Sequence, residues 1–459
     1  MNDCVSRYYR CPERYVRLAQ KSALSRTKGY FRFGGDTVCF GTYCGQHTSD
    51  SPANGLYDAL LDTTVAEGTT VLPFDLNELV ENLRCELYAH DWHGERFKST
   101  LAKLYYLVRP ALPFVVRNYL KKLHLKGWQD LPFPRWPVDC SVDNLLTHIL
   151  QLLVRSSEAK RIPFIWFWPE GASSCAIVTH DVETESGQDL CSNLMDIDDS
   201  FGIKASFQIV PEERYPVSAQ FLASIRERGF EVVVHDLNHD GHLYSDKDQF
   251  LERAAKINSY GEQYRADGFR AAVLYRKPLW FDALKFSYDM SIPNVAHLDP
   301  QHGGCCTVMP FFIGNVLELP VTTTQDYMLF HLLDDYSTRL WKRQSELIME
   351  KHGLISFIVH PDYIIKARER HIYAELLAYL TDLRRSKDVW ITTPGQVNRW
   401  WRQRAEMRLV EDGEDLRIEG AGSERARIAF ASEQNGQLIF TFETPASGRI
   451  NLPAFNISK

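Results

Sequence analysis

The sequence predicts an α/β protein whose central part is a β/α barrel with about seven strands. Short apolar segments alternate with amphipathic helical segments between residues 162 and 404, which is the pattern of parallel strands joined by crossover helices. The polar residues of this region directly follow the apolar segments. A β/α barrel forms its active site at the carboxyl ends of its strands, so we expect the functional residues at one rim.

Each predicted strand is a short apolar run, and the predicted helices lie between these runs. The strands are CAIVTHD (175–181), ASFQIVP (205–211), FEVVVHD (230–236), GFRAAVL (268–274), VLELPVT (316–322), LISFIVHP (354–361) and DVWITTP (388–394). The intervening helices are expected at 217–229, 247–266 and 339–353. With 459 residues the chain is too long for one domain.

Two flanking regions complete the predicted organisation. Residues 1–161 form a mixed α+β region, with a hairpin at 34–46 and helices at 76–89 and 97–128. Residues 162–404 are the barrel, which ends in a helix at 395–408. Short alternating segments at 405–459 predict a small antiparallel β module.

The composition limits the classes of partner and the cellular compartment that we expect for the protein. A net charge of −7 offers no basic face for nucleic acid. Lys121, Lys122 and Lys126 fit either a solvated helix face or peripheral contact with a membrane surface. The ten cysteines include no CxxC pair, which excludes a zinc ribbon. Because no secretory leader and no transmembrane segment are evident, we expect a cytoplasmic protein with reduced thiols.

The end of the first barrel strand carries two carboxylates. Asp181 and Glu183 stand two positions apart, so on an extended segment they point to the same side. Two adjacent carboxylates repel each other unless a cation lies beside them. The pair therefore indicates either a cation site or a polar strand tip that turns into solvent.

A second motif supplies imidazoles at another strand end. His235 follows a buried strand and His239 comes four residues later, a spacing that places both imidazoles on one side of a helical turn. Two imidazoles and one carboxylate form a facial ligand set for zinc, nickel, iron or cobalt. Such a set leaves positions for water and substrate, as catalytic metal sites do. His242 fits an additional ligand or a solvent-side residue.

Two further polar residues stand at strand ends. Arg270 could keep a neighbouring aspartate ionised and oriented, or form a surface ion pair. His360 ends an apolar strand and fits a general acid or a buried histidine with satisfied hydrogen bonds.

The order T-x-D-x-[DE], HxxxH, FR and a strand that ends in His resembles the polysaccharide deacetylases of carbohydrate esterase family 4, which have the NodB-like fold. The resemblance covers roughly residues 162–400. It implies a distorted (β/α) barrel of about seven strands and a divalent metal, usually zinc. Carried over residue by residue, it implies the following roles: Asp181 as catalytic base, Arg270 as the residue that orients it, His360 as general acid, and Glu183, His235 and His239 as metal ligands.

The motifs also depart from the family pattern. The usual TFDDG is replaced by Thr179-His180-Asp181-Val182-Glu183, a DxE variant that leaves open which carboxylate contacts the metal. Asp236 stands where the family has Ser or Thr, and Ala272 where it commonly has Pro. No aspartate that pairs with the acid histidine is evident, and Asp289 is the candidate. These changes indicate an outlying subgroup with its own substrate.

Three functions fit these residues. The first is metal-dependent removal of an N-acyl group, most simply N-acetyl, from an amino sugar in a polysaccharide or glycan precursor. The second is hydrolysis of another small C–N bond, such as that of a formamide or a ureide, since this fold hosts related chemistries. The third is non-catalytic sugar binding in a glycan assembly complex.

Overall fold

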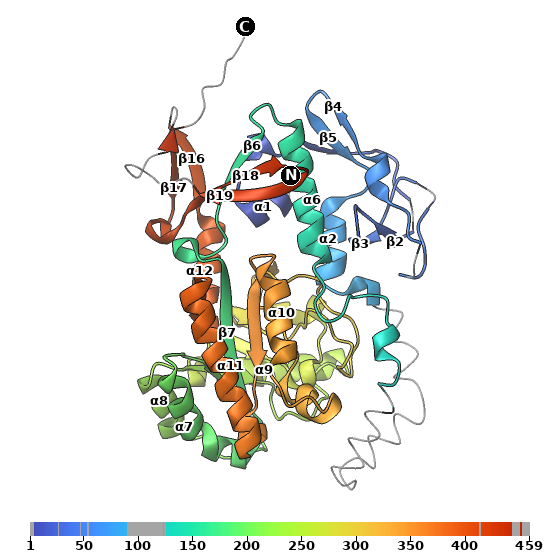
Figure 1. The fold of residues 1–459 in the computed structure, drawn as a ribbon. Helices are drawn as coiled ribbons and strands as arrows, with labels where there is room; N and C mark the ends of the chain where they lie inside the picture. The colour runs from blue at the N-terminus through green and yellow to red at the C-terminus, as the bar shows by residue number, and fades with distance from the viewer. Residues whose placement is uncertain are drawn as a thin grey trace. The chain divides into compact units, whose positions relative to one another are not determined.

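The computed structural model describes residues 4–25, 27–45, 47–52, 55–89, 123, 125–412, 415–442 and 450–451. The chain divides into two compact units (Figure 1). One consists of Met1–Arg84, Cys140–Ala172 and Arg399–Lys459, and the other of Cys85–Asp139 and Ser173–Asn398. The boundaries predicted at 161/162 and 404/405 stay a prediction. Most of the predicted helix 97–128, with Lys121 and Lys122, lies outside the described residues.

The second unit is built around a curled, open sheet with the strand order β12-β13-β11-β10-β9-β8-β7-β14, and β15 pairs with the first half of β7. Every pair in this sheet is parallel except β12 with β13. The strands are β7 (Ser174–Val182), β8 (Ser206–Ile209), β9 (Glu231–His235), β10 (Gly268–Arg270), β11 (Tyr288–Asp289), β12 (Phe311–Ile313), β13 (Val316–Glu318), β14 (Leu354–Ile358) and β15 (Val389–Thr392).

This sheet confirms the predicted α/β fold class. All seven predicted strands are present. Strands β11 and β12, of two and three residues, were not predicted. All nine residues of β7 are buried, as expected for a parallel strand that is covered on both faces.

Side chains link the two ends of the open sheet. Thr322 follows β13, and its Oγ1 donates to the carbonyl of Leu354 at 2.7 Å and accepts from the amide of Ser356 at 2.9 Å. The next hydroxyl, on Thr323, donates to the carbonyl of Ser356 at 2.7 Å. Threonine hydroxyls thus satisfy backbone groups of β14 that a neighbouring strand would otherwise pair with.

Helices follow the strands, and the first three of them begin at side-chain caps. The helices are α7 (Glu185–Ser200), α8 (Ala219–Glu227), α9 (Lys247–Tyr264), α10 (Arg339–Met349) and α11 (Ala367–Ser386). Thr184 Oγ1 accepts from the amide of Gly187 at 3.1 Å and caps α7. This cap ends the extended segment immediately after Glu183, and so places that residue between a strand and a helix.

The first unit combines short helices with small sheets. Its helices are α1 (Cys4–Tyr9), α2 (Leu76–Arg84) and α6 (Ser141–Ser156), and α12 (Pro394–Glu406) begins in the second unit and ends in the first. Strands β2 (Gly29–Arg32) and β3 (Val38–Gly41) form the predicted hairpin, with its first strand earlier than expected. A further sheet holds β1 (Leu18–Gln20), β5 (Thr69–Leu72) and β4 (Thr64–Ala66).

The predicted C-terminal strands are also present, and they divide between two sheets. One sheet has the order β16-β17-β20 and the other β19-β18-β6. The strands are β6 (Arg161–Ile165), β16 (Arg408–Asp412), β17 (Asp415–Glu419), β18 (Ile428–Gln434), β19 (Gln437–Phe442) and β20 (Ile450–Asn451). In the described part of the chain, no helix combines the length and the apolarity needed to cross a bilayer.

Candidate active site at the carboxyl ends of the strands

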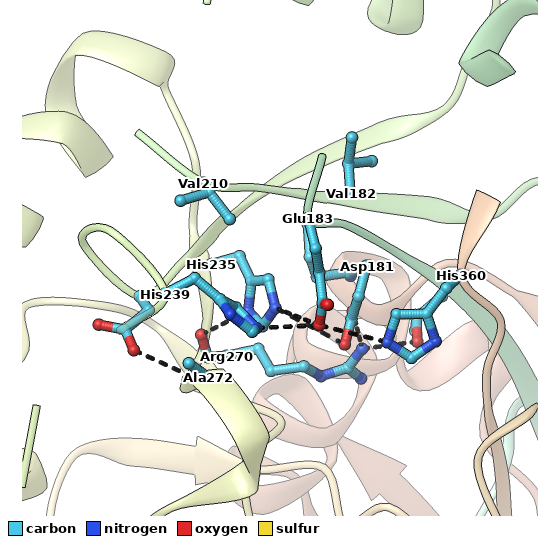
Figure 2. A network of polar contacts seen from close by, with 12 residues as sticks. Asp181, Val182, Glu183, Val210, His235, His239, Arg270, Ala272 and His360 are labelled. Carbon is cyan, nitrogen blue, oxygen red and sulfur yellow. Dashed lines mark hydrogen bonds and ion pairs between the residues drawn. The ribbon is translucent and has the colours of Figure 1, made fainter. Parts of the chain in front are cut away.

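The six residues to which the family resemblance gives a role lie together at one rim of the sheet (Figure 2). In this view the imidazoles of His235 and His239 lie on one side of Glu183, and the imidazole of His360 lies on the other. The positions follow from the topology, because parallel strands bring their carboxyl ends to the same edge. The contributing segments are the end of β7, the end of β9 and the loop after it, the end of β10, and the residues after β14.

The two histidines meet through a loop and not through the predicted helical turn. Residues 236–241 are not helical. Asp236 and His239 both adopt left-handed backbone, with φ of 56° and 57°. Aspartate tolerates this conformation better than most residues. The loop reverses the chain and brings the ring centroids of His235 and His239 to 4.9 Å.

The two departures from the family pattern near this loop contact each other. The Asp236 carboxylate accepts from the amide of Leu237 at 2.7 Å and from the amide of Ala272 at 3.3 Å. The amide of Asp236 itself donates to the carbonyl of Arg270 at 2.8 Å. A proline at position 272 would have no N–H to donate, so Ala272 and Asp236 form a matched pair that ties the histidine loop to the end of β10.

Three side chains form a candidate metal site. Glu183, His235 and His239 each offer one ligand atom, and these atoms all lie within 4.8 Å of one another. Oε1 of Glu183 lies 2.9 Å from Nε2 of His239 and 3.9 Å from Nε2 of His235. Metal–ligand bonds of about 2.1 Å place neighbouring ligand atoms roughly 3 to 3.5 Å apart, so the spacing fits a divalent cation.

The hydrogen bonds of the histidines support the same assignment. His235 directs Nδ1 at the carbonyl of Arg270 at 3.0 Å, so Nδ1 carries the proton and Nε2 keeps its lone pair. Among the described residues, Nε2 of His235 is buried without a hydrogen-bond partner, and the buried Nε2 of His239 faces only the Glu183 carboxylate, at 2.9 Å. A bound cation would satisfy both nitrogen atoms, so these residues fit a divalent metal.

Asp181 is buried beside a fixed positive charge. Arg270 donates from Nη1 to Asp181 Oδ1 at 2.6 Å and to Thr179 Oγ1 at 2.8 Å, and from Nε to the carbonyl of Met290 at 3.1 Å. Burial alone would raise the pKa of Asp181, but the Arg270 guanidinium and the imidazoles of His235 and His360 together hold that pKa below its ordinary value. Asp181 is therefore ionised at neutral pH and held in one orientation.

His360 pairs with Asp326, and not with Asp289 as the sequence predicted. Nδ1 of His360 lies 2.6 Å from Asp326 Oδ1, and the amide of His360 donates to Asp326 Oδ2 at 2.7 Å. Burial disfavours the charged imidazole, but Asp326 and Glu183 raise the pKa of His360 well above its ordinary value. Nε2 of His360 lies 3.4 Å from Glu183 Oε1, which places this imidazole at the site.

Asp289 has a different environment. It lies in β11 in register with Glu318 of β13, and its Oδ1 accepts from the amide of Ser291 at 2.8 Å. Burial raises the pKa of Asp289 to about 6, and burial together with Asp289 raises the pKa of Glu318 well above its ordinary value. The two carboxyl groups thus lie side by side with at least one of them protonated, which makes Asp289 part of the sheet interior.

His180, the remaining departure, faces away from the site residues into a buried network. Its Nε2 lies 3.0 Å from Asp198 Oδ2 and its Nδ1 lies 3.1 Å from the carbonyl of Val359. Tyr373 donates to the other oxygen of Asp198. These contacts connect β7 with the segment just before His360, and thereby hold the two ends of the site in register.

Comparison with known proteins adds three similar structures over about half of the chain. Neither a scan against protein-family models nor a search of curated proteins found a match. A solved structure described as a polysaccharide deacetylase from Mycobacterium smegmatis is 19% identical and covers 52% of this chain and 93% of its own, with a TM-score of 0.43. An allantoinase is 13% identical and covers 51% and 92%, with a TM-score of 0.40. A polysaccharide deacetylase described as involved in O-antigen biosynthesis, from Bordetella bronchiseptica, is 15% identical and covers 51% and 86%, with a TM-score of 0.30. Two of these three structures are described as polysaccharide deacetylases.

Proposed function

We propose that the protein hydrolyses an N-acyl group, most simply an N-acetyl group, from an amino sugar in a glycan or glycan precursor. One observation carries this proposal. A candidate three-residue metal site lies beside an ionised carboxylate and a protonated imidazole, which together are groups that can carry out metal-assisted amide hydrolysis. A binding protein without catalysis would have no need for Asp181 and His360 in these protonation states.

Glu183, His235 and His239 would hold the metal, and zinc suits two imidazoles and a carboxylate. When bound, the cation supplies Lewis acidity toward an amide carbonyl and toward water. In this assignment Glu183 is the metal carboxylate. Asp181 Oδ1 is already engaged by Arg270 at 2.6 Å, whereas Glu183 Oε1 lies 2.9 Å from Nε2 of His239.

Asp181 then acts as general base. Its lowered pKa keeps it ionised, so it can accept a proton from the attacking water. Arg270 restricts one carboxylate oxygen, which leaves the other for that proton. Arg270 is a positioning residue in this scheme, since it acts through Asp181.

His360 acts as general acid. Because Asp326 accepts from Nδ1 at 2.6 Å, the proton on Nε2 remains available for transfer. An amine is a poor leaving group until it is protonated, so the transfer from Nε2 completes cleavage of the C–N bond. Base and acid are thus both in their active protonation states at the same pH.

The experiment is to measure acetate release with added zinc, cobalt or nickel. The substrates are lipid-linked and nucleotide-linked N-acetyl amino sugars, with a formamide and a cyclic ureide as a second set. Release of acetate from a sugar with a dependence on metal supports the proposal. Turnover of the formamide or ureide alone would assign a different amide hydrolase. Sugar binding with no metal uptake and no turnover would assign the protein to non-catalytic sugar binding.

A further inference from the structure

A small cavity lies in the second unit at the same rim as the site. Its rim is formed by the half-buried residues Trp136, Val295 and Gln325. Its buried floor includes Thr324 and Asp299, and the remaining lining is largely apolar. The cavity offers about 20 Å³ to the centre of a water molecule, which is enough for one water or one small substituent.

Two buried polar atoms in the cavity lining are left without partners. Thr324 is 6% exposed and Asp299 is 4% exposed. Among the described residues, neither Thr324 Oγ1 nor Asp299 Oδ1 has a hydrogen-bond partner. An unsatisfied buried polar atom costs about 1–3 kcal/mol, so these atoms point to an occupant that forms hydrogen bonds. The methyl group of an acetyl substituent could not supply them.

The cavity adjoins the acid side of the site. Thr324 and Gln325 directly precede Asp326, which holds His360. Two lining residues, Leu274 and Val321, pack in one buried cluster with Ile358, two positions before His360. Because His360 is assigned to protonate the leaving amine, the sugar that carries this amine must lie on the same side as the cavity.

The charge balance of the cavity excludes an anionic occupant. Arg276 donates from Nε to Glu86 at 2.6 Å, and a second contact joins Nη2 to the same carboxylate, so the guanidinium charge is already paired. Burial raises the pKa of Asp299 to about 7. In its protonated form this carboxyl can donate to a hydroxyl group and accept from it, whereas a second carboxylate or a phosphate would find no counter-charge.

Trp136 is held in place at the rim. Its ring stacks on His297 at 6.1 Å between centroids, and the ring of Trp128 meets it edge-on at 4.8 Å. A fixed aromatic ring beside a recess with two hydrogen-bonding groups suits a sugar, because the ring contacts C–H groups while one substituent enters the recess.

We propose that this cavity is a specificity subsite for an uncharged, hydroxyl-bearing substituent of the sugar, of the size of a hydroxymethyl group, with Thr324 and Asp299 as its hydrogen-bonding partners. The assignment to the leaving-amine side rests on the proposed function. The presence of the subsite can be tested without catalysis.

The test measures binding of sugar probes to the metal-loaded protein. Saturation-transfer NMR detects the binding, and titration gives the affinity. The probes are N-acetylglucosamine and N-acetylgalactosamine, each with its 6-deoxy and 6-carboxylate forms. We expect the hydroxymethyl form of one sugar to bind about five- to tenfold more tightly than its 6-deoxy form, as the loss of one hydrogen bond predicts. The carboxylate form should bind more weakly still.

Thr324→Val removes the hydroxyl and keeps the shape, so it should abolish the preference for hydroxymethyl over 6-deoxy. Thr324→Ser should restore it. Thr323→Val is the matched control, because the Thr323 hydroxyl already donates to Ser356 at 2.7 Å; this variant should lower stability and keep the preference.

The outcomes separate the two proposals. Failure of wild-type protein to bind any of these sugars would overturn the subsite, as would a preference that Thr324→Val leaves unchanged, which would assign the cavity to a structural water. Binding with the expected preference but without turnover of any amide would overturn the proposed function and keep the subsite.

Discussion

The metal side of the site and its proton-transfer side differ in how completely their hydrogen bonds are satisfied. On the metal side, Nε2 of His235 is buried and has no hydrogen-bond partner among the described residues, and Nε2 of His239 contacts Glu183, another member of the ligand set. On the proton-transfer side, Asp181 is held by Arg270 and His360 by Asp326. Asp181 and His360 are thus held in position by protein groups alone, whereas the ligand set is complete only with a cation. Substitutions on the two sides should therefore impair the protein in different ways.

The largest effect is expected on the metal side. His235→Ala or His239→Ala removes one of two imidazole ligands, so bound metal and activity should be lost together. Metal content by elemental analysis and the rate of acetate release measure both. His242→Ala is the control, because His242 is exposed and its backbone amide is bonded to Asp240 at 2.8 Å. If His242→Ala also arrives without metal, the ligand set has been assigned wrongly.

The next effect separates base from ligand. Asp181→Asn keeps the shape and cannot accept the water proton, so it should retain metal and lose about 10²–10⁴-fold in kcat. Glu183→Gln should lose metal instead, because Glu183 Oε1 lies within 4 Å of Nε2 of both imidazoles, at 2.9 Å from His239 and 3.9 Å from His235. Metal content and rate are measured side by side for the two variants. A metal-free Asp181→Asn with a loaded Glu183→Gln would reverse the two roles.

Only some of the residues on the proton-transfer side could be predicted from the sequence. Strand ends were predictable because apolar runs followed by polar residues have a clear pattern, and Asp181, Arg270 and His360 were found in this way. Asp326 was missed because it follows no strand; it comes after an irregular run of threonines. Asp289 does stand in a strand, yet it faces Glu318 in the sheet interior.

On the metal side the residues were predictable and their geometry was not. The HxxxH spacing suggested a helical turn, but Asp236 and His239 adopt left-handed backbone. The contact that holds this loop joins Asp236 to the amide of Ala272, 36 positions away. A pairing between such distant positions is a consequence of the fold, and no local pattern indicates it.

A smaller effect is expected from Asp326→Asn, which leaves both catalytic groups in place. Removal of the charge should lower the pKa of His360, because Asp326 raises it. The acid works when protonated and activity falls as pH rises through this pKa, so the alkaline limb of the kcat profile should move to lower pH. Metal content should not change.

Asp289→Asn is the comparison for this variant, since it removes the carboxylate that the sequence suggested. The alkaline limb of the kcat profile of Asp289→Asn should coincide with that of the wild type. An unshifted profile for Asp326→Asn would show that Asp326 does not act through the protonation of His360.

The smallest effect tests how firmly the base is held. Thr179 Oγ1 accepts from Arg270 at 2.8 Å and donates to the carbonyl of Phe357 at 2.8 Å. Thr179→Val removes this link and keeps the shape. Arg270 retains its bonds to Asp181 and to the carbonyl of Met290, so the base should stay oriented.

We expect kcat to fall about tenfold or less and stability to fall by about 1–3 kcal/mol, the cost of leaving a buried donor and acceptor unpaired. Unfolding midpoints, metal content and kcat are measured on the same preparation. A loss in kcat beyond a hundredfold, with metal and fold retained, would mean that Arg270 alone does not hold Asp181, and the proton-transfer side would then depend on every one of its hydrogen bonds.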